Sequence, residues 1–503
     1  MLKLKNLLIG ILLSFAGATI GVAQDVSLTA ADGTLTVEGV LLGFDGEYYQ
    51  IRSAYGDLTL DGSGVSCSGP GCPGLDAFVA QARFAGASSI GEKLLPHLLE
   101  GFAHQEGLDL RRVSRSDQVF SYLLVDKVDD TTVAEFAFDL NSSREGIAAL
   151  QANEADFALT RFGFELTGFP APRILGLDAL TFSVAGENPM REIPFDAIPA
   201  VMGGEIDNWQ ALGGPDLPLI MADDSLSAPD VPLSELPELQ EKQIAFPAMS
   251  DLVSQDSLVI GMTRLSDQGG AVPLRLSGSC GAAFIPDALS LKTRDYPLPA
   301  PQFLYQSPHR KPRLVRQFLR YLGSETAERD VERAGFVSRR LVEVPLQAQG
   351  ERLANAVLQA GEDTSLTDLQ TMLESLSDAR RLTMTFRFQA GSARPDIQSV
   401  SDRDALAGLI DQGRFDGKEL IFAGFSDGDG GSDANRRIAL RRAVAMLQAL
   451  QGQADVEGAD ITLTAYGFGE ALPLACDDSD IGREINRRVE LWVRDTPKED
   501  HQR

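Results

Sequence analysis

Strand-like and helical patterns of apolar residues alternate along most of this chain. Between residues 25 and 75, short alternating runs rich in β-branched and aromatic residues are separated by glycine-containing turns, which predicts a small β-rich module. From 78 to 345, and again on a smaller scale from 381 to 495, strand-like runs alternate with amphipathic helical runs. This alternation is typical of α/β domains. Leucines three and four positions apart predict helices in the polar stretch 346–380, either as a linker or as a hairpin packed on a neighbour.

The first 23 residues predict a secretory signal peptide. Met1–Lys5 is basic, Leu7–Ile20 is apolar, and Ala23 ends a short stretch of small side chains of the kind that a signal peptidase reads. The apolar run is short for a membrane anchor, the alternative, which needs about 20 residues. We therefore expect cleavage after Ala23 and release into the periplasm. The charged residues 496–503 are expected to form a disordered tail.

The length and charge of the chain restrict its architecture and its partners. With 503 residues, of which 44% are hydrophobic, the chain is long enough for about two to four domains. The formal net charge of −27 repels nucleic acids and anionic lipids, so neither is an expected partner. No residue spacing indicates a metal site, a cofactor or a nucleophile–base pair, and an enzyme is the least favoured class of protein.

The four cysteines fall into a close pair and a distant pair. Cys67 and Cys72 flank the sequence SGPG, a turn that lets its ends meet, so we expect a disulfide worth about 2 kcal/mol in an oxidising compartment. Cys280 and Cys476 either remain free or pair with each other across two domains, because the sequence does not supply the geometry that a disulfide requires.

Residues 78–340 carry a series of short motifs in a fixed order. They are FAGASSIG at 84–91, ADFALTR at 155–161, GGEIDNWQALGG at 203–214 and SLVIG at 257–261. In this order they resemble the phosphate-type periplasmic binding proteins. The resemblance implies a type II binding-protein fold, with two α/β lobes and a ligand cleft between them. It also implies a small anion such as phosphate as ligand, and a transporter or sensor in the inner membrane as partner.

The same resemblance indicates anion-binding residues in the first lobe. Ser88 and Ser89 stand directly before a predicted helix at 90–102, where free N–H groups and the helix dipole favour an anion. The alternative is that the two serines only cap this helix. Thr160 and Arg161 stand where the family has a Ser–Arg element, and Arg161 serves either an anion or a structural ion pair.

One segment departs from the pattern of these binding proteins. Where the family carries an Arg and a Ser-Gly-Thr triplet that opens a helix, residues 221–229 read MADDSLSAP, with Ser225 as the remaining candidate ligand. The Arg and the Gly are absent, and the carboxylates of Asp223 and Asp224 would oppose a dianion. Phosphate is therefore less well supported as the ligand than the fold is.

A second resemblance covers residues 381–495. Asp427 in a glycine-rich loop, Asn435 and Arg442 on one face of the following helix, and the sequence GREINRRVE at 482–490 resemble the OmpA-like peptidoglycan-binding domain. By this resemblance Asp427 binds the amine and Arg442 the carboxylate of diaminopimelate in the wall peptide, with Asn435 in support. An acid and a base also suit any ligand that carries an ammonium and a carboxylate. The alternative is an ordinary salt bridge, and Arg487 and Arg488 are expected to be structural.

Two functions follow from these observations. In the first, the protein is a periplasmic solute-binding protein of a Gram-negative bacterium, held non-covalently on peptidoglycan. In the second, it is an envelope structural or interaction protein whose binding-protein domain is a scaffold without a small ligand. The altered segment 221–229 favours the scaffold, whereas the Ala-Ser-Ser-Ile-Gly turn at 87–91 and Arg161 favour solute binding.

Overall fold

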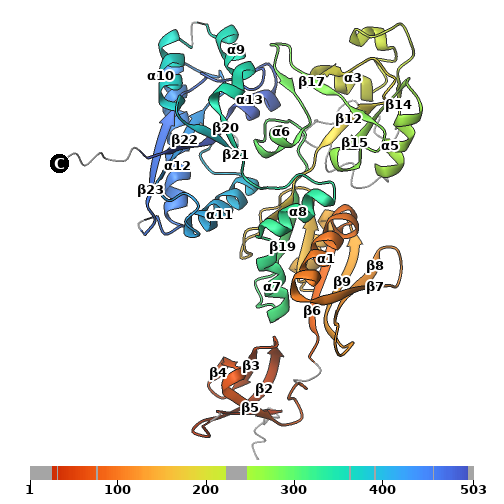
Figure 1. Cartoon of the computed structure of the whole chain (residues 1–503), viewed down its shortest axis with the longest axis vertical. Helices are drawn as coiled ribbons and strands as arrows, with labels where there is room; N and C mark the ends of the chain where they lie inside the picture. Colours follow the sequence, from red (N-terminus) through yellow and green to blue (C-terminus); the bar gives the residue numbers. More distant parts are fainter. Residues whose placement is uncertain are drawn as a thin grey trace, which may run out of the picture. The chain divides into compact units, whose positions relative to one another are not determined.

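The computed structural model describes residues 25–30, 32–74, 78–222, 246–361, 364–389, 392–456 and 458–496 (Figure 1). The predicted signal peptide, Ser225 and residues 497–503 lie outside this part of the chain. The chain forms two compact units, one of residues 1–80 with 310–315 and one of residues 81–309 with 316–503. No helix in the described ranges is both long enough and apolar enough to cross a bilayer.

The smaller unit is an antiparallel five-stranded sheet in the order β4-β3-β2-β1-β5. Tyr49 and Ile51 alternate with more exposed residues along its third strand and are almost fully buried, as expected for a sheet with one covered face. Cys67 and Cys72 form the predicted disulfide, with their Cα atoms 5.9 Å apart. The strands are β1 (Val26–Ala30), β2 (Thr36–Phe44), β3 (Tyr48–Ser53), β4 (Gly56–Asp61) and β5 (Val65–Ser68).

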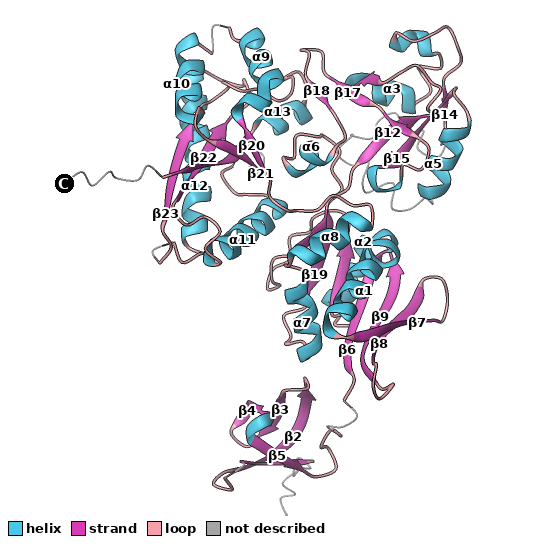
Figure 2. Cartoon of the chain, viewed as in Figure 1, coloured by secondary structure: helices cyan, strands magenta, loops and turns pink. Residues whose placement is uncertain are grey.

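The larger unit begins with a lobe built on a seven-stranded mixed sheet, β11-β19-β10-β6-β9-β8-β7 (Figure 2). The Phe84 ring stacks on those of Phe138 and Phe157, each with its centroid 4.8 Å away, and forms the centre of an aromatic core. The strands are β6 (Ala80–Ala87), β7 (Leu108–Ser114), β8 (Val119–Asp126), β9 (Thr132–Asn141), β10 (Phe157–Thr160), β11 (Arg173–Gly176) and β19 (Gln302–Gln306). The helices are α1 (Leu95–Glu106), which continues a π-helical turn at Ile90–Leu94, α2 (Ser143–Gln151), α7 (Arg313–Tyr321) and α8 (Glu325–Arg333).

The chain passes from the first lobe to the second at residues 177–179 and returns at residues 297–301. Ala179 pairs with Pro299 where these two connecting segments meet. The second lobe holds a four-stranded sheet, β14-β15-β12-β16, and a three-stranded sheet, β13-β17-β18, around a core that includes the buried Trp209. The strands are β12 (Leu180–Val184), β13 (Glu192–Pro194), β14 (Ile220–Met221), β15 (Val259–Arg264), β16 (Val272–Pro273), β17 (Arg275–Ser277) and β18 (Ala283–Phe284). The helices are α3 (Ile198–Met202), α5 (Phe246–Gln255) and α6 (Ala288–Lys292).

The C-terminal domain is a five-stranded sheet, β20-β21-β24-β22-β23, with helices on both faces (Figure 1). Apolar residues of α11 and α12 cover one face, and those of α9 and α10 cover the other. The strands are β20 (Glu343–Pro345), β21 (Arg380–Arg387), β22 (Lys418–Phe425), β23 (Ile461–Gly467) and β24 (Arg488–Asp495). The helices are α9 (Gly350–Gln359), α10 (Leu366–Leu376), α11 (Ile397–Asp411), α12 (Ser432–Gln451) and α13 (Asp480–Asn486).

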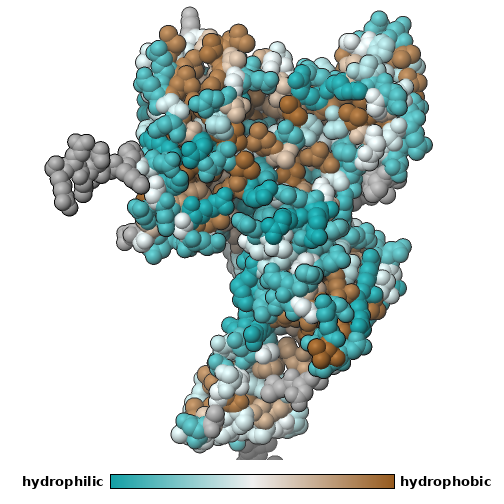
Figure 3. Space-filling view, viewed as in Figure 1, coloured by the Kyte–Doolittle hydropathy of each residue, from teal (hydrophilic) through white to brown (hydrophobic). Residues whose placement is uncertain are grey.

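The architecture confirms the predicted fold class of two α/β lobes and a small α/β domain, preceded by a β module. Of the two alternatives for residues 346–380, the structure has the packed one, because Leu369, Met372 and Leu376 of α10 are buried against the sheet. The same helices also expose apolar side chains, namely Val357, Leu358 and Leu366. Figure 3 shows brown atoms gathered over α9 and α10.

Candidate functional site

The loop after β22 and the helix α12 bring the predicted wall-binding residues together. β22 ends at Phe425, the loop contains Asp427, and α12 carries Asn435 and Arg442 on its buried face. A third residue completes the cluster, because Arg487 Nη1 donates to Asp427 Oδ2 at 2.6 Å. The sequence indicates only a structural role for Arg487, so this contact is missed by sequence reasoning. The sequence signal that could have indicated this contact is the pair of consecutive arginines, Arg487 and Arg488, where β24 begins.

Hydrogen bonds fix the shape of this loop. Asn435 Nδ2 donates to Glu470 Oε1 at 2.6 Å. The Gly428 N–H donates to Asp477 Oδ2 at 2.8 Å, and Asn486 Nδ2 donates to the other oxygen of the same carboxylate, also at 2.8 Å. The segment that precedes α13 therefore holds the loop that carries Asp427 in place.

The cluster retains unused hydrogen-bonding capacity. Arg442 is 5% exposed, and its Nε donates to the Ser392 carbonyl at 3.3 Å. Its Nη1, the Ser426 hydroxyl and Arg487 Nε are buried and have no hydrogen-bond partner among the residues that the structure describes. Burial lowers the pKa of Arg442, the Arg487 charge lowers it further, and Asp427 opposes both effects. One carboxylate and two guanidiniums thus form a site that suits a ligand with an ammonium and a carboxylate.

The predicted anion-binding residues meet at one edge of the first-lobe sheet. β6 and β10 are parallel neighbours, with Leu159 opposite Gly86, so Ser88 and Ser89 follow one strand where Thr160 and Arg161 end the other. The carboxyl ends of parallel strands lie at the same edge, where such folds bind ligands. Ser225 lies outside the described residues and cannot be placed at this edge.

The hydrogen bonds at this edge distinguish the predicted anion-binding residues from one another. Ser89 makes no capping bond to the helix that follows it, and its buried hydroxyl has no partner in the described part of the chain. Thr160 Oγ1 donates to the Phe162 carbonyl at 2.8 Å, so its proton is already used. The Arg161 side chain is 1% exposed, and its backbone N–H donates to Ser143 Oγ at 3.1 Å.

Two further polar residues at this edge escape sequence reasoning. Asn141 ends β9, and its buried Oδ1 has no partner among described residues. Ser143 begins α2, whose N-terminus is closed by a capping box between Ser142 and Glu145. That Ser-x-x-Glu spacing is the sequence signal that could have located this second helix N-terminus.

Several known proteins are similar to parts of this chain. No protein-family model matches the chain. An ABC-type phosphate transport receptor from Vibrio cholerae aligns over 51% of this chain and 99% of its own, at 16% identity and a TM-score of 0.38. Outer membrane porin F of Pseudomonas aeruginosa is 29% identical over 119 residues, 24% of this chain and 33% of that protein. The periplasmic domain of Helicobacter pylori MotB covers 25% of this chain and 78% of its own, at 21% identity and a TM-score of 0.21.

One part of this chain is thus similar to phosphate-binding proteins such as PstS from Borrelia burgdorferi and another to porin F and MotB, and we call these parts the PstS-like fold and the OmpA-like domain. The PstS-like fold spans about half of the chain, and the OmpA-like domain about a quarter. The chain spans about a third of the length of porin F, the curated relative that it matches.

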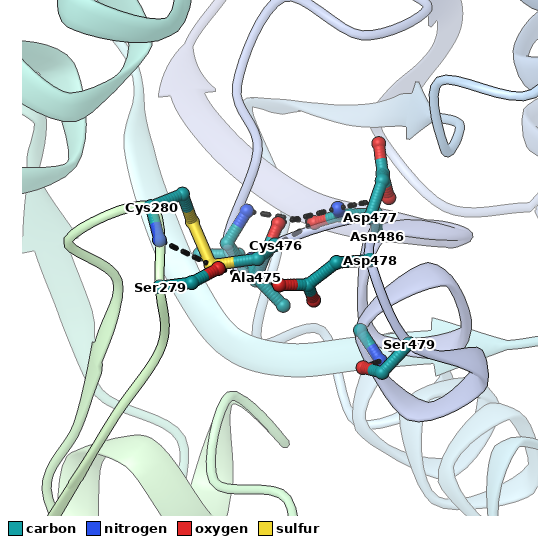
Figure 4. Close-up of a disulfide and its surroundings, with 10 residues drawn as sticks. Ser279, Cys280, Ala475, Cys476, Asp477, Asp478, Ser479 and Asn486 are labelled. Atoms are coloured by element: carbon teal, nitrogen blue, oxygen red, sulfur yellow. Dashed lines mark hydrogen bonds between the residues drawn. A yellow bond between two sulfur atoms is a disulfide. The ribbon is translucent and has the colours of Figure 1, made fainter. Parts of the chain in front are cut away.

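A disulfide joins the OmpA-like domain to the second lobe of the PstS-like fold (Figure 4). Cys280, in the turn between β17 and β18, bonds to Cys476, with Cα atoms 5.6 Å apart, so the sequence alternative in which they pair is the one observed. The Cys280 N–H also points to Cys476 Sγ at 2.9 Å, and Ser279 Oγ donates to Asp478 Oδ2 at 2.5 Å. Cys476 directly precedes Asp477, which holds the loop of the wall-binding cluster.

Proposed function

We propose that this protein is a periplasmic binding protein of a Gram-negative envelope, held on peptidoglycan by its OmpA-like domain. The observation that carries the proposal is the cluster of Asp427 in the loop before α12, Arg442 on α12 and Arg487, which pairs with Asp427. In it, Asp427 binds the amine of diaminopimelate and Arg442 its carboxylate, while Asn435 supports the loop. The buried, unused Nη1 of Arg442 supports this assignment, because a ligand carboxylate would satisfy it.

Retention on purified peptidoglycan sacculi tests the tether. Asp427→Asn and Arg442→Ala should each weaken retention about 10- to 100-fold, because a hydrogen bond to a charged group is worth about 1.5–3 kcal/mol. Arg441→Ala is the matched control, since Arg441 is the neighbouring arginine on α12 and is exposed. Melting curves establish that each variant is folded. Normal retention of both site variants would refute the assignment.

We further propose that the edge of the first-lobe sheet binds a small anion such as phosphate, for delivery to a transporter or sensor in the inner membrane. Ser88, Ser89 and Arg161 are the proposed ligands, and the unpartnered hydroxyl of Ser89 is the observation that favours binding over capping. Thr160 is a weaker candidate because its hydroxyl proton is engaged.

Thermal melts with phosphate, sulfate and molybdate test this second step. An anion at about 100 times its dissociation constant should add about 2.7 kcal/mol to the free energy of unfolding. Ser89→Ala should abolish the shift, whereas Ser114→Ala, at an exposed position of the same sheet, should preserve it. The absence of a shift with every anion would favour the scaffold function. One observation already favours that alternative, because the OmpA-like domain contacts both lobes, through Cys476 and through the Arg394–Glu165 ion pair.

A further inference from the structure

A cavity of about 280 Å³ lies between the PstS-like fold and the OmpA-like domain. Its walls come from the loop after β10, the segment 294–303, the end of β21, the start of α11, and α13. It contains Arg161 of the sheet edge but not Ser88, Ser89 or Thr160, and neither Asp427 nor Arg442 of the wall-binding cluster. The cavity therefore shares Arg161 with the sheet edge and is otherwise a distinct candidate site.

Two buried arginines give the cavity its chemistry. Arg294 is 8% exposed and donates to Asp396 and to Ser399 Oγ, the latter at 3.0 Å. Its Nε is buried and has no hydrogen-bond partner among the described residues. Arg294 also holds a left-handed backbone conformation, with φ of 58°, which a non-glycine residue rarely adopts.

Arg387 is 6% exposed and lacks a carboxylate partner among the described residues. Its Nη1 donates to the carbonyls of Glu484 and Ile485, both at 2.8 Å, and its Nη2 donates to the Arg294 carbonyl. Burial and the Arg294 charge lower the pKa of Arg387 to about 9, so the guanidinium remains charged at neutral pH. Capping the C-terminus of α13 satisfies its N–H groups, but three main-chain carbonyls do not neutralise its charge.

Besides Arg161, the lining carries two arginines, Arg294 and Arg387, and two carboxylates, those of Asp396 and Glu484. Asp396 already pairs with Arg294, and Glu484 is exposed to solvent. Buried charges are normally paired, so a negatively charged occupant would complete the surroundings of Arg387.

The size and the remaining walls select the kind of anion. A cavity of 280 Å³ has the volume of about nine water molecules, which is far more than a five-atom inorganic oxyanion fills. Phe162, Tyr296 and Phe303 and three prolines supply much of the wall, and such surfaces favour an apolar ligand body. We propose that this cavity binds a small organic monocarboxylate, with its carboxylate at Arg294 and Arg387 and its apolar part against the aromatic wall.

Calorimetric titration of the mature chain with benzoate, hexanoate, acetate and phosphate tests the proposal. Benzoate or hexanoate should bind more tightly than acetate or phosphate. Arg294→Lys keeps a cation beside Asp396 but removes Nε and the planar fork, and it should weaken binding at least 10-fold. Arg339→Lys is the matched control, because Arg339 forms a comparable ion pair with Asp402 on α11, at 2.7 Å.

A second pair of variants acts through volume rather than charge. Ile481 lines the cavity from α13, so Ile481→Trp should abolish binding while Ile481→Val preserves it. Failure of all four anions to bind, or equal binding by the wild type and Arg294→Lys, overturns the proposal. Binding that is lost in Ser89→Ala and kept in Arg294→Lys also overturns it and assigns the anion to the sheet edge instead.

Discussion

Removal of the Cys280–Cys476 disulfide is the perturbation whose effect follows most directly from the structure. The two residues are 196 positions apart. On the chain-entropy model, a loop of that length stabilises the folded state by about 5 kcal/mol, against about 2 kcal/mol for the five-residue separation of Cys67 and Cys72. Since ion pairs such as Arg381–Asp295, at 2.9 Å, join the same two parts, we expect a measured loss of about 3–5 kcal/mol from the double variant Cys280→Ser/Cys476→Ser.

The tryptophans provide a selective assay for this loss. The chain has two, Trp209 in the second lobe and Trp492 in β24, and both are buried in the larger unit. Denaturant unfolding followed by tryptophan fluorescence therefore reports on that unit. The control Cys67→Ser/Cys72→Ser removes a disulfide of the smaller unit and should leave the fluorescence midpoint unchanged. Equal midpoints for the wild type and the 280/476 variant would refute the loop-entropy reasoning.

The same variant has a local consequence in the OmpA-like domain. Cys476 precedes Asp477, whose carboxylate accepts hydrogen bonds from Gly428 and Asn486. Freeing this segment removes an anchor from the loop that carries Asp427. Retention of this variant on sacculi should therefore fall, by less than in Asp427→Asn because the charged pair itself survives. Unchanged retention would show that the two hydrogen bonds hold the loop without the disulfide.

Two further predictions concern stability. Gly86→Ala should destabilise the first lobe severely, because φ is 120° and the added Cβ would lie 2.2 Å from the Leu159 carbonyl oxygen. The control Gly408→Ala in α11 adds a Cβ that meets no atom within 4 Å, so it should be neutral or stabilising. Thermal melts compare the two variants. Burial raises the pKa of Asp295, but the charge of Arg381 outweighs it and holds the pKa below 3.8. The ionised Asp295 carboxylate therefore contributes its full stabilisation above about pH 4, and this contribution is lost as the pH falls through the pKa of Asp295 in the folded state. Asp295→Asn should flatten the acid side of the curve of unfolding free energy against pH. An unchanged acid side would contradict this prediction.

Local sequence signals predict most of the fold. The run Leu382–Phe388 becomes most of β21, and the motif at 203–214 contains the buried Trp209. Side-chain pairs far apart in the chain escape such reasoning, because only tertiary packing brings them together. Arg487 meets Asp427 across 60 positions, and the sequence alone leaves the pairing of Cys280 open. The binding cluster is therefore only partly predictable, since its charges are visible in sequence but their partners are not.

The links from the OmpA-like domain to the two lobes differ greatly in strength. A covalent bond at Cys280 and the ion pair at Asp295, whose partner Arg381 is buried, tie the domain to the second lobe. The first lobe is reached through Glu165 and Arg394, whose exposed ion pair is worth about 0–1 kcal/mol, and through Arg339 and Asp402, whose ion pair at 2.7 Å is largely buried. If an anion at the sheet edge draws the lobes together, the exposed pair breaks more easily than the buried one. The OmpA-like domain is thus joined to the second lobe by a covalent bond, whereas the ion pairs that join it to the first lobe are reversible.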